Sequence, residues 1–176
     1  MSSTNVLIFA AHFWSRMQAM KQRRRRSTCP INFFVEAFGD SWSFLIIRDL
    51  VFFGKHTFGE FASSSERIAS NILASRLARL EQEGILVKAP DESDRRKEIY
   101  SLTEKGLDLI PILLEMANWS AKHDPETSAP LAFVARVNAD KENMFRLIRE
   151  TVRAGGAIFA GPGSVVEQLA VAGSGS

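Results

Sequence analysis

Two groups of hydrogen-bond donors stand out in the middle of the chain. The first lies in SNILASRLARLEQEG, residues 70–84, and the second is the basic run at residues 95–97. Arginine, lysine, asparagine and serine side chains donate to phosphate oxygens and to base edges, so both groups fit nucleic-acid binding. The candidate contacts are Ser70, Asn71, Ser75, Arg76, Arg79, Arg95, Arg96 and Lys97.

Residues 70–83 predict an amphipathic helix that presents the first group on one side. At about 100° per residue, three leucines share one face, and the opposite face carries Asn71, Ser75, Ala78, Arg79 and Gln82. Ser70 is expected to cap the helix, and Gly84 to end it. The free N–H groups of such an N-terminus suit a phosphate. Taken alone, the stretch favours a solvated helix face, so its neighbours decide the interpretation.

The neighbouring elements place this helix in a winged helix-turn-helix. The sequence predicts a strand over 56–58, a short helix over 59–64 and a hairpin over 85–102 with the turn DESD. In this order of elements the second helix enters the major groove, and the hairpin tip, here about residues 88–97, reaches the flanking backbone. We therefore expect base contacts from Asn71, Ser75 and Arg79, a base or phosphate contact from Arg76, and backbone positioning from Ser70 and residues 95–97.

Further helices flank this core. Pro30 begins a helix over 30–38 with Cys29 as its N-cap, and residues 41–53 are apolar nearly all round, as in a buried central helix. A long helix is predicted from Thr103 to about His123, with a bend because Pro111 removes a hydrogen bond. Its apolar stripe is wider than one small core needs. The fold class is mainly α with a small β-hairpin wing and extra N- and C-terminal helices.

Charge and composition divide the chain into five segments. Residues 1–29 hold six basic and no acidic residues, whereas residues 30–125 hold 11 basic and 15 acidic ones, a net charge of −4. Nucleic-acid binding would therefore depend on local clusters. The expected organisation is a basic arm (1–28), the winged core (29–123), a linker (124–139), an accessory helix (140–154) and a flexible tail (155–176).

Several other classes of function find little support. The lone Cys29 excludes a disulfide within one chain and fits a reducing compartment, so we expect a cytoplasmic protein. The apolar run at 6–11 is too short to span a bilayer. Three scattered histidines give no metal-ligand spacing, and no other motif indicates an enzyme or a cofactor.

Four motifs together give the chain a specific resemblance. They are Cys-Pro at 29–30, Gly-Asp-x-Trp at 39–42, Leu-Thr-Glu-Lys-Gly at 102–106, and Trp119 near the end of the long helix. Over roughly residues 20–123 the chain resembles the HxlR family of bacterial winged-helix transcriptional regulators. The wing sequence Asp-Arg-Arg at 94–96 is also similar to MarR-like regulators.

The resemblance implies a homodimer that binds a double-stranded DNA operator. It places the first helix and the long helix at the dimer interface, where the expected contacts are Phe34, Ile110, Leu113, Leu114 and Ala117. It also aligns Cys29 with the redox-sensing thiol of several family members. A helix dipole and the nearby arginines would favour the reactive thiolate there. The effector is thus either an oxidant or another small molecule.

Two alternatives remain open from the sequence. A winged helix used only for protein–protein interaction fits the net charge of −4 over residues 30–125. A thiol-redox protein that acts without DNA would rest on Cys29 alone.

Overall fold

The computed structural model describes residues 26–38 and 40–173 of the chain. They belong to two units, residues 1–37 and residues 38–176. Most of the predicted basic arm, residues 1–25, lies outside the described residues. The first unit holds nearly all of helix α2, Pro30–Phe38, whose first turn is closed by a hydrogen bond from Phe33 N to Cys29 O at 3.0 Å.

Helix α3, Ser41–Phe53, is the central helix of the second unit, as predicted. Asp40 caps its N-terminus by accepting a hydrogen bond from Ser43 N at 3.0 Å. Gly54 ends it in the left-handed conformation, with φ of 62°, which few other residues adopt. The buried apolar side chains of α3 are Ile46, Ile47, Leu50 and Val51.

Helices α4, Phe58–Ala62, and α5, Ser70–Gln82, form the helix-turn-helix. The strand expected over 56–58 does not form, because Thr57 caps α4 in a capping box with Glu60. Ser70 is not the cap of α5: Ala69 holds that position without a side-chain hydrogen bond. The three leucines of α5 are buried as predicted, at Leu73, Leu77 and Leu80.

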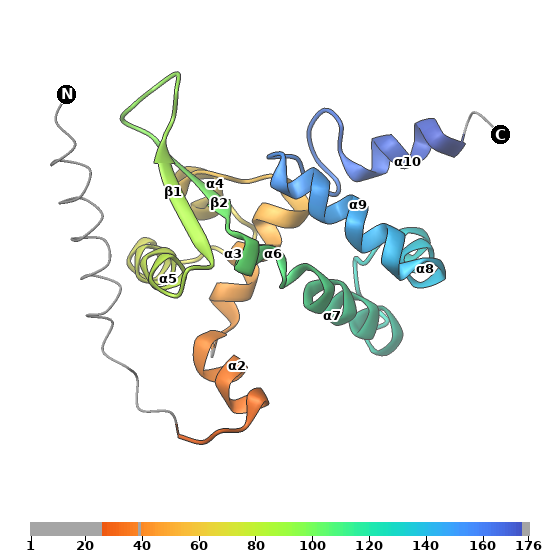
Figure 1. Cartoon of the computed structure of the whole chain (residues 1–176), viewed down its shortest axis with the longest axis horizontal. Coiled ribbons are helices and arrows are strands. Elements are labelled where there is room, and N and C mark those ends of the chain that lie inside the picture. Colours follow the sequence, from red (N-terminus) through yellow and green to blue (C-terminus); the bar gives the residue numbers. More distant parts are fainter. Residues whose placement is uncertain (1–25, 39, 174–176) are drawn as a thin grey trace, which may run out of the picture. The chain divides into compact units, whose positions relative to one another are not determined.

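The wing is an antiparallel hairpin of β1, Leu86–Pro90, and β2, Glu98–Leu102 (Figure 1). The register pairs Leu86 with Leu102 and Pro90 with Glu98. Ile85 N donates to Leu80 O at 2.9 Å, which ties the start of β1 directly to the end of α5. The predicted class, mainly α with a small wing, is confirmed.

The predicted long helix is two helices, α6, Glu104–Leu107, and α7, Ile110–His123. Pro111 does more than bend it, because the ring has no N–H for the Leu107 carbonyl and sits in the first turn of α7. Gly106 in α6 packs closely on the wing, since a Cβ there would clash with the Ile85 carbonyl oxygen.

Three helices follow α7, and two of them correct the sequence-based expectations. Helix α8, Leu131–Ala139, lies in the expected linker, and α10, Val165–Gly173, lies in the expected flexible tail; between them, α9 spans Lys141–Arg153. Ile158 N and Phe159 N donate to the carbonyl oxygens of Val51 and Phe52, both at 2.9 Å. These contacts, with buried Ile158 and Val165, order a segment whose composition alone suggests disorder.

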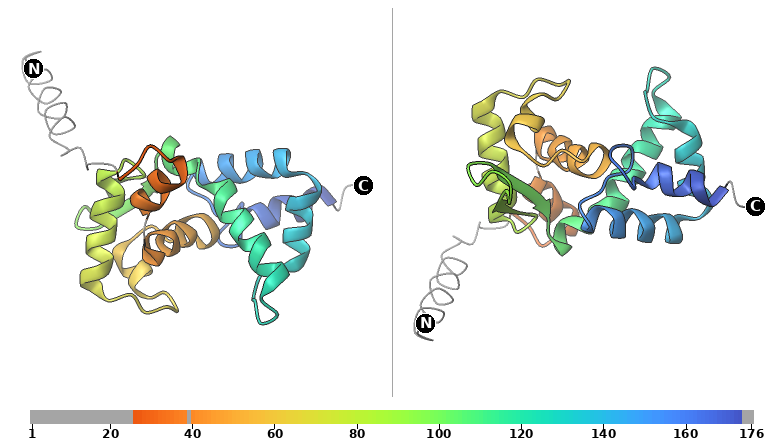
Figure 2. Two further views of the ribbon diagram at one scale, coloured as in Figure 1. Left: turned by 90° about the horizontal axis from the view of Figure 1, so that it is seen from below. Right: turned by 90° about the horizontal axis from the view of Figure 1, so that it is seen from above.

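The C-terminal helices and α5 lie on opposite sides of α3 (Figures 1 and 2). Over residues 26–38 and 40–173, no helix is both long and apolar enough to cross a membrane.

Candidate nucleic-acid interface

The outward side of α5 is polar but almost free of charge. Asn71, Ser75 and Ala78 are exposed, and so are Ser70 and Gln82 at the two ends of the helix. Small side chains at the centre let a helix axis come close to another surface, and the amide and hydroxyl groups suit base edges. The structure thus places Asn71 and Ser75 on one exposed face and leaves Ser70 exposed at the N-terminal end of the helix.

The two arginines of α5 lie at the edge of this face, beside Asp40. Arg76 Nε is 2.9 Å from Asp40 Oδ1, and Arg79 Nη1 is 3.8 Å from Asp40 Oδ2. Their side chains are 25% and 23% exposed. The buried Nε–H of Arg76 is not aligned with Asp40 Oδ1 well enough for a hydrogen bond, so the contact is chiefly an ion pair. Both predicted cationic contacts of α5 therefore lie beside the carboxylate that caps α3.

Asp40 is charged under ordinary conditions. Burial alone would raise the pKa of its carboxyl, but hydrogen bonds from Ser43 and the charge of Arg76 outweigh burial and lower that pKa. The sequence offers Asp40 or Ser41 as the cap of α3, and the structure has Asp40 there. Its contact with α5 joins residues 36 positions apart, and no periodicity in the sequence signals such a contact.

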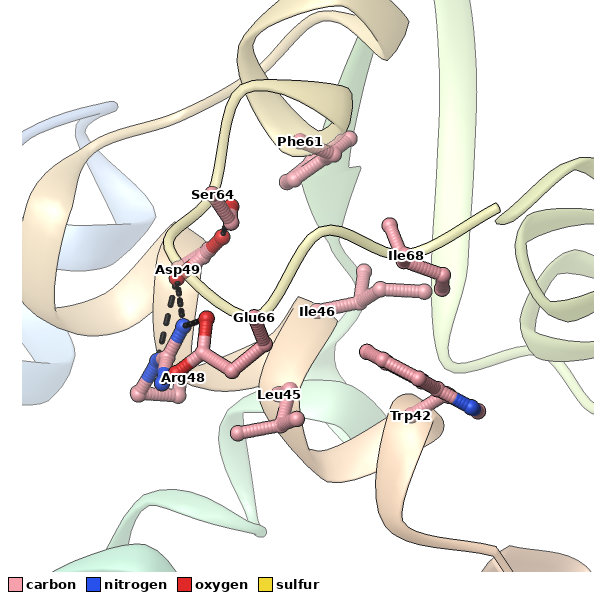
Figure 3. Close-up of a pocket in the computed structure, with 9 residues that line it drawn as sticks. All are labelled: Trp42, Leu45, Ile46, Arg48, Asp49, Phe61, Ser64, Glu66 and Ile68. Carbon is pink, nitrogen blue, oxygen red and sulfur yellow. Dashed lines mark hydrogen bonds and ion pairs between the residues drawn. The ribbon is translucent and has the colours of Figure 1, made fainter. Parts of the chain in front are cut away.

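A buried charge cluster fixes the turn between α4 and α5 (Figure 3). Asp49 on α3 accepts hydrogen bonds from Arg48 Nη2 at 2.6 Å, from Lys55 Nζ at 3.2 Å and from Ser64 Oγ. Arg48 also pairs with Glu66 in the turn. Because Asp49 is only 2% exposed, these donors satisfy a carboxylate that would otherwise be strongly unfavourable there. The cluster connects α3 to the turn that leads into α5.

The wing cations are exposed and loosely held. Arg95, Arg96 and Lys97 all lie at the tip of the hairpin, as predicted. Arg96 Nε is 3.0 Å from Asp94 Oδ1, but its side chain remains 90% exposed. Asp91 accepts hydrogen bonds from Ser93 N at 2.7 Å and from Ser93 Oγ at 2.6 Å, which shapes the turn. The tip thus offers three cations to an approaching polyanion.

The predicted dimer contacts on α7 are mostly inside the protomer. Ile110, Leu113 and Leu114 are 1%, 5% and 6% exposed, because they face the core of the second unit. Ala117 is half-buried. The exposed apolar side chains of α7 are instead Met116, 46% exposed, and Trp119, 64% exposed, whose ring lies 4.9 Å from that of His123.

In the first unit, Phe34 is half-buried, and the exposed apolar side chains of α2 are Ile31, Phe33 and Val35. Cys29 has a free, exposed thiol. Its N–H donates to Ser27 Oγ at 3.3 Å, and its carbonyl begins α2. The roles of Phe34 at an interface and of Cys29 as a sensor stay predictions.

Comparison with known proteins agrees with this architecture. A sequence model of the HxlR-like helix-turn-helix family matches residues 37–128. Two HTH-type transcriptional regulators that are themselves uncharacterised match about half of the chain. They are Rv3095 of Mycobacterium tuberculosis, 33% identical over 96 residues, and YdeP of Bacillus subtilis, 30% identical over 95 residues.

These matches cover 54% of this chain in each case, and 60% of Rv3095 and 73% of YdeP. The chain therefore spans less than two thirds of the length of the first of these relatives. Among solved structures, the candidate transcription factor PA1607 is 39% identical, with a TM-score of 0.54 over 59% of this chain and 72% of that one. The matched region contains the helix-turn-helix, the wing and α7, and the chain belongs to the HxlR-like helix-turn-helix family.

Proposed function

We propose that the protein is a transcriptional regulator that binds double-stranded DNA in a sequence-dependent way. One observation carries the proposal: the uncharged, donor-bearing face of α5 and the tip of the β1–β2 hairpin, which exposes Arg95, Arg96 and Lys97, belong to one unit, in the order of a winged helix-turn-helix. The names of Rv3095 and YdeP, both HTH-type transcriptional regulators, support it. Such a role would place the protein in the cytoplasm.

In this proposal α5 lies in the major groove. Asn71 and Ser75 contact base edges from the centre of the exposed face, and Arg79 reaches a base from its edge. Arg76 contacts a base or a phosphate nearby, and Ser70 positions the DNA backbone. The wing residues Arg95, Arg96 and Lys97 neutralise flanking phosphates and carry no sequence information.

The regulator is further proposed to act as a homodimer. Both units expose apolar side chains, Ile31, Phe33 and Val35 on α2, and Met116 and Trp119 on α7. Exposed apolar groups of this size commonly mark an interface. Met116→Glu and Trp119→Glu would yield monomers that keep the wild-type circular dichroism spectrum, whereas Glu142→Gln at an exposed position of α9 would leave the dimer intact. A monomeric wild type in sedimentation at micromolar concentration would contradict the dimer.

The test of DNA binding is selection of bound duplexes from a randomised library. A dimer should enrich a two-fold symmetric site whose halves lie about 34–36 Å, or a multiple of this, apart. The matched control is Asn71→Ala/Ser75→Ala, which removes base contacts from the exposed face without touching the leucine core. If no sequence is enriched over random DNA, the protein-interaction alternative replaces this proposal.

An oxidant is the effector that the exposed Cys29 thiol favours. Diamide would accept two electrons and two protons from two thiols and become the hydrazine, as the two sulfurs join in an inter-subunit disulfide. We expect diamide to change operator affinity and to produce a dimer on a non-reducing gel for the wild type only. An identical response in Cys29→Ser would exclude this thiol as the sensor.

A further inference from the structure

A cavity of about 570 Å³ lies between α3, α7 and α8, within the second unit. Its wall includes the C-terminal end of α3, the middle of α7, residues 127–130, the inner side of α8 and Phe159. The volume falls within the range of about 300–1,000 Å³ that small-molecule sites usually have. None of the predicted DNA contacts lines it.

The apolar part of the wall is aromatic. Phe52, Phe53, Phe133 and Phe159 all line the cavity. The ring of Phe159 makes edge-on contacts with those of Phe52 and Phe133, with centroids 5.8 Å and 5.0 Å apart. Their rings form a surface on which a flat apolar molecule can stack.

The polar part of the wall offers hydrogen bonds without free charge. Its two charged side chains are both paired, Arg48 with Asp49 and Glu66, and Glu115 with Lys141. The amide groups of Asn118 and Asn138 are joined by a hydrogen bond of 2.8 Å at the edge of the cavity. An ionic ligand would therefore find no unpaired opposite charge there, whereas a neutral polar group would find amide partners.

We propose that this cavity binds an uncharged, mainly aromatic small molecule, which stacks on the phenylalanines and places its polar group against Asn118 and Asn138. Helix α8, which the sequence does not signal, supplies the wall opposite α3.

Arg48 connects the cavity to the helix-turn-helix. Its guanidinium lies 5.7 Å from the centre of the Phe53 ring and also pairs with Glu66, four residues before α5 begins. Arg48 and Phe53 both line the cavity, so a molecule that stacks on Phe53 lies beside Arg48 and thereby shifts the Arg48–Glu66 pair. The ligand thereby alters the position of α5 and, since this step rests on the proposed DNA-binding function, the affinity for DNA.

The binding step is tested with N-phenylnaphthylamine, a neutral aromatic dye whose fluorescence rises in apolar surroundings, on the full chain. We expect one saturable site per chain and weaker binding of anilinonaphthalene sulfonate, which adds an anionic group to the same ring system. Val134→Trp fills the cavity and should raise the dissociation constant by at least about tenfold. Ala135→Trp places the same ring on the exposed side of α8 and should leave it within about twofold.

Each result bears on one step. Absence of saturable dye binding, or equal effects of the two tryptophan variants, overturns the cavity as a ligand site. A change in sedimentation with Val134→Trp but not with Ala135→Trp also overturns it, because a second copy of the chain would then occupy the groove.

The coupling step is tested by titrating a selected DNA duplex with and without the dye. The dye should change affinity by about fivefold or more in the wild type. In Glu66→Gln it should bind as before, yet change DNA affinity less. An unchanged DNA affinity in the wild type overturns the coupling alone. If no duplex is bound at all, the DNA-binding proposal and the coupling fail, while the dye result still decides the cavity.

Discussion

The recognition helix α5 and the wing hold their arginines in opposite ways. Arg76 and Arg79 are about three-quarters buried and lie beside Asp40, whereas Arg96 is 90% exposed and pairs with Asp94 of its own turn. An exposed pair contributes little and breaks readily, while a partly buried one restricts its side chains. If the proposed DNA contacts form, the side chains of the α5 arginines have fixed directions, as discrimination between bases requires, and those of the wing stay mobile, because a phosphate requires only charge.

The largest effect is expected from Arg79. If the fixed direction of the Arg79 side chain serves base recognition, Arg79→Ala should relax the preference for particular base pairs. The loss should be about 1–3 kcal/mol for a lost bidentate contact. The measurement is competition binding against a library of single-base operator variants. Uniform weakening across the library would show that Arg79 contacts a phosphate, as the wing arginines are proposed to do. The proposed difference between α5 and the wing would then be wrong.

The wing should show the opposite signature. Arg95→Ala/Arg96→Ala should weaken binding to all sequences alike and flatten the plot of log affinity against log salt by about 0.9 for each lost phosphate contact. Fluorescence anisotropy at several salt concentrations gives this slope. An unchanged slope together with altered base preference would mean that the wing reads sequence.

A smaller effect on DNA affinity is expected when Asp40 loses its charge. Asn caps a helix about as well as Asp, so Asp40→Asn should keep α3 intact while removing the negative charge beside Arg76 and Arg79. Binding to random duplex DNA should tighten, by no more than about 1 kcal/mol as for a solvent-screened pair. Equal affinity of the variant and the wild type at low salt would show that Asp40 does not compete with phosphate.

The smallest effect is expected from Glu66, which lies in the turn before α5, and it concerns the stability of the fold. Hydrogen bonding from Arg48 lowers the pKa of Glu66 to about 2. A carboxyl whose pKa is lowered on folding stabilises the protein above its unfolded pKa, which is about 4.3. That contribution is lost as pH falls from there towards about 2. The wild type should therefore lose up to about 1 kcal/mol more than Glu66→Gln over this range, as measured by urea unfolding.

Features that depend on local patterns were predictable. The spacing of Leu73, Leu77 and Leu80 gave the buried face of α5, and the turn residues at 91–94 gave the wing. The exposed positions of Asn71 and Ser75 follow from the same spacing. These predictions hold because each depends on neighbours within a few residues.

Features that depend on distant contacts were missed. The pairing of Asp40 with α5 joins two elements, and α8 and α10 are ordered by contacts with α7, α9 and the end of α3. The glycine- and alanine-rich composition around Ala157 and Ile158 suggests disorder, yet both residues are completely buried. The wide apolar stripe around Leu113 likewise serves the protomer's own core, which the C-terminal helices enlarge.

Asp40 also bears on how quickly the protein could find its target. In the proposed complex, a phosphate that binds Arg76 exchanges with the Asp40 carboxylate at every landing on DNA. On random sequence no base contact compensates for that exchange, so the residence time there is short. A genome offers about 10⁶–10⁹ competing sites, so brief visits to each one leave more of the protein free to continue the search.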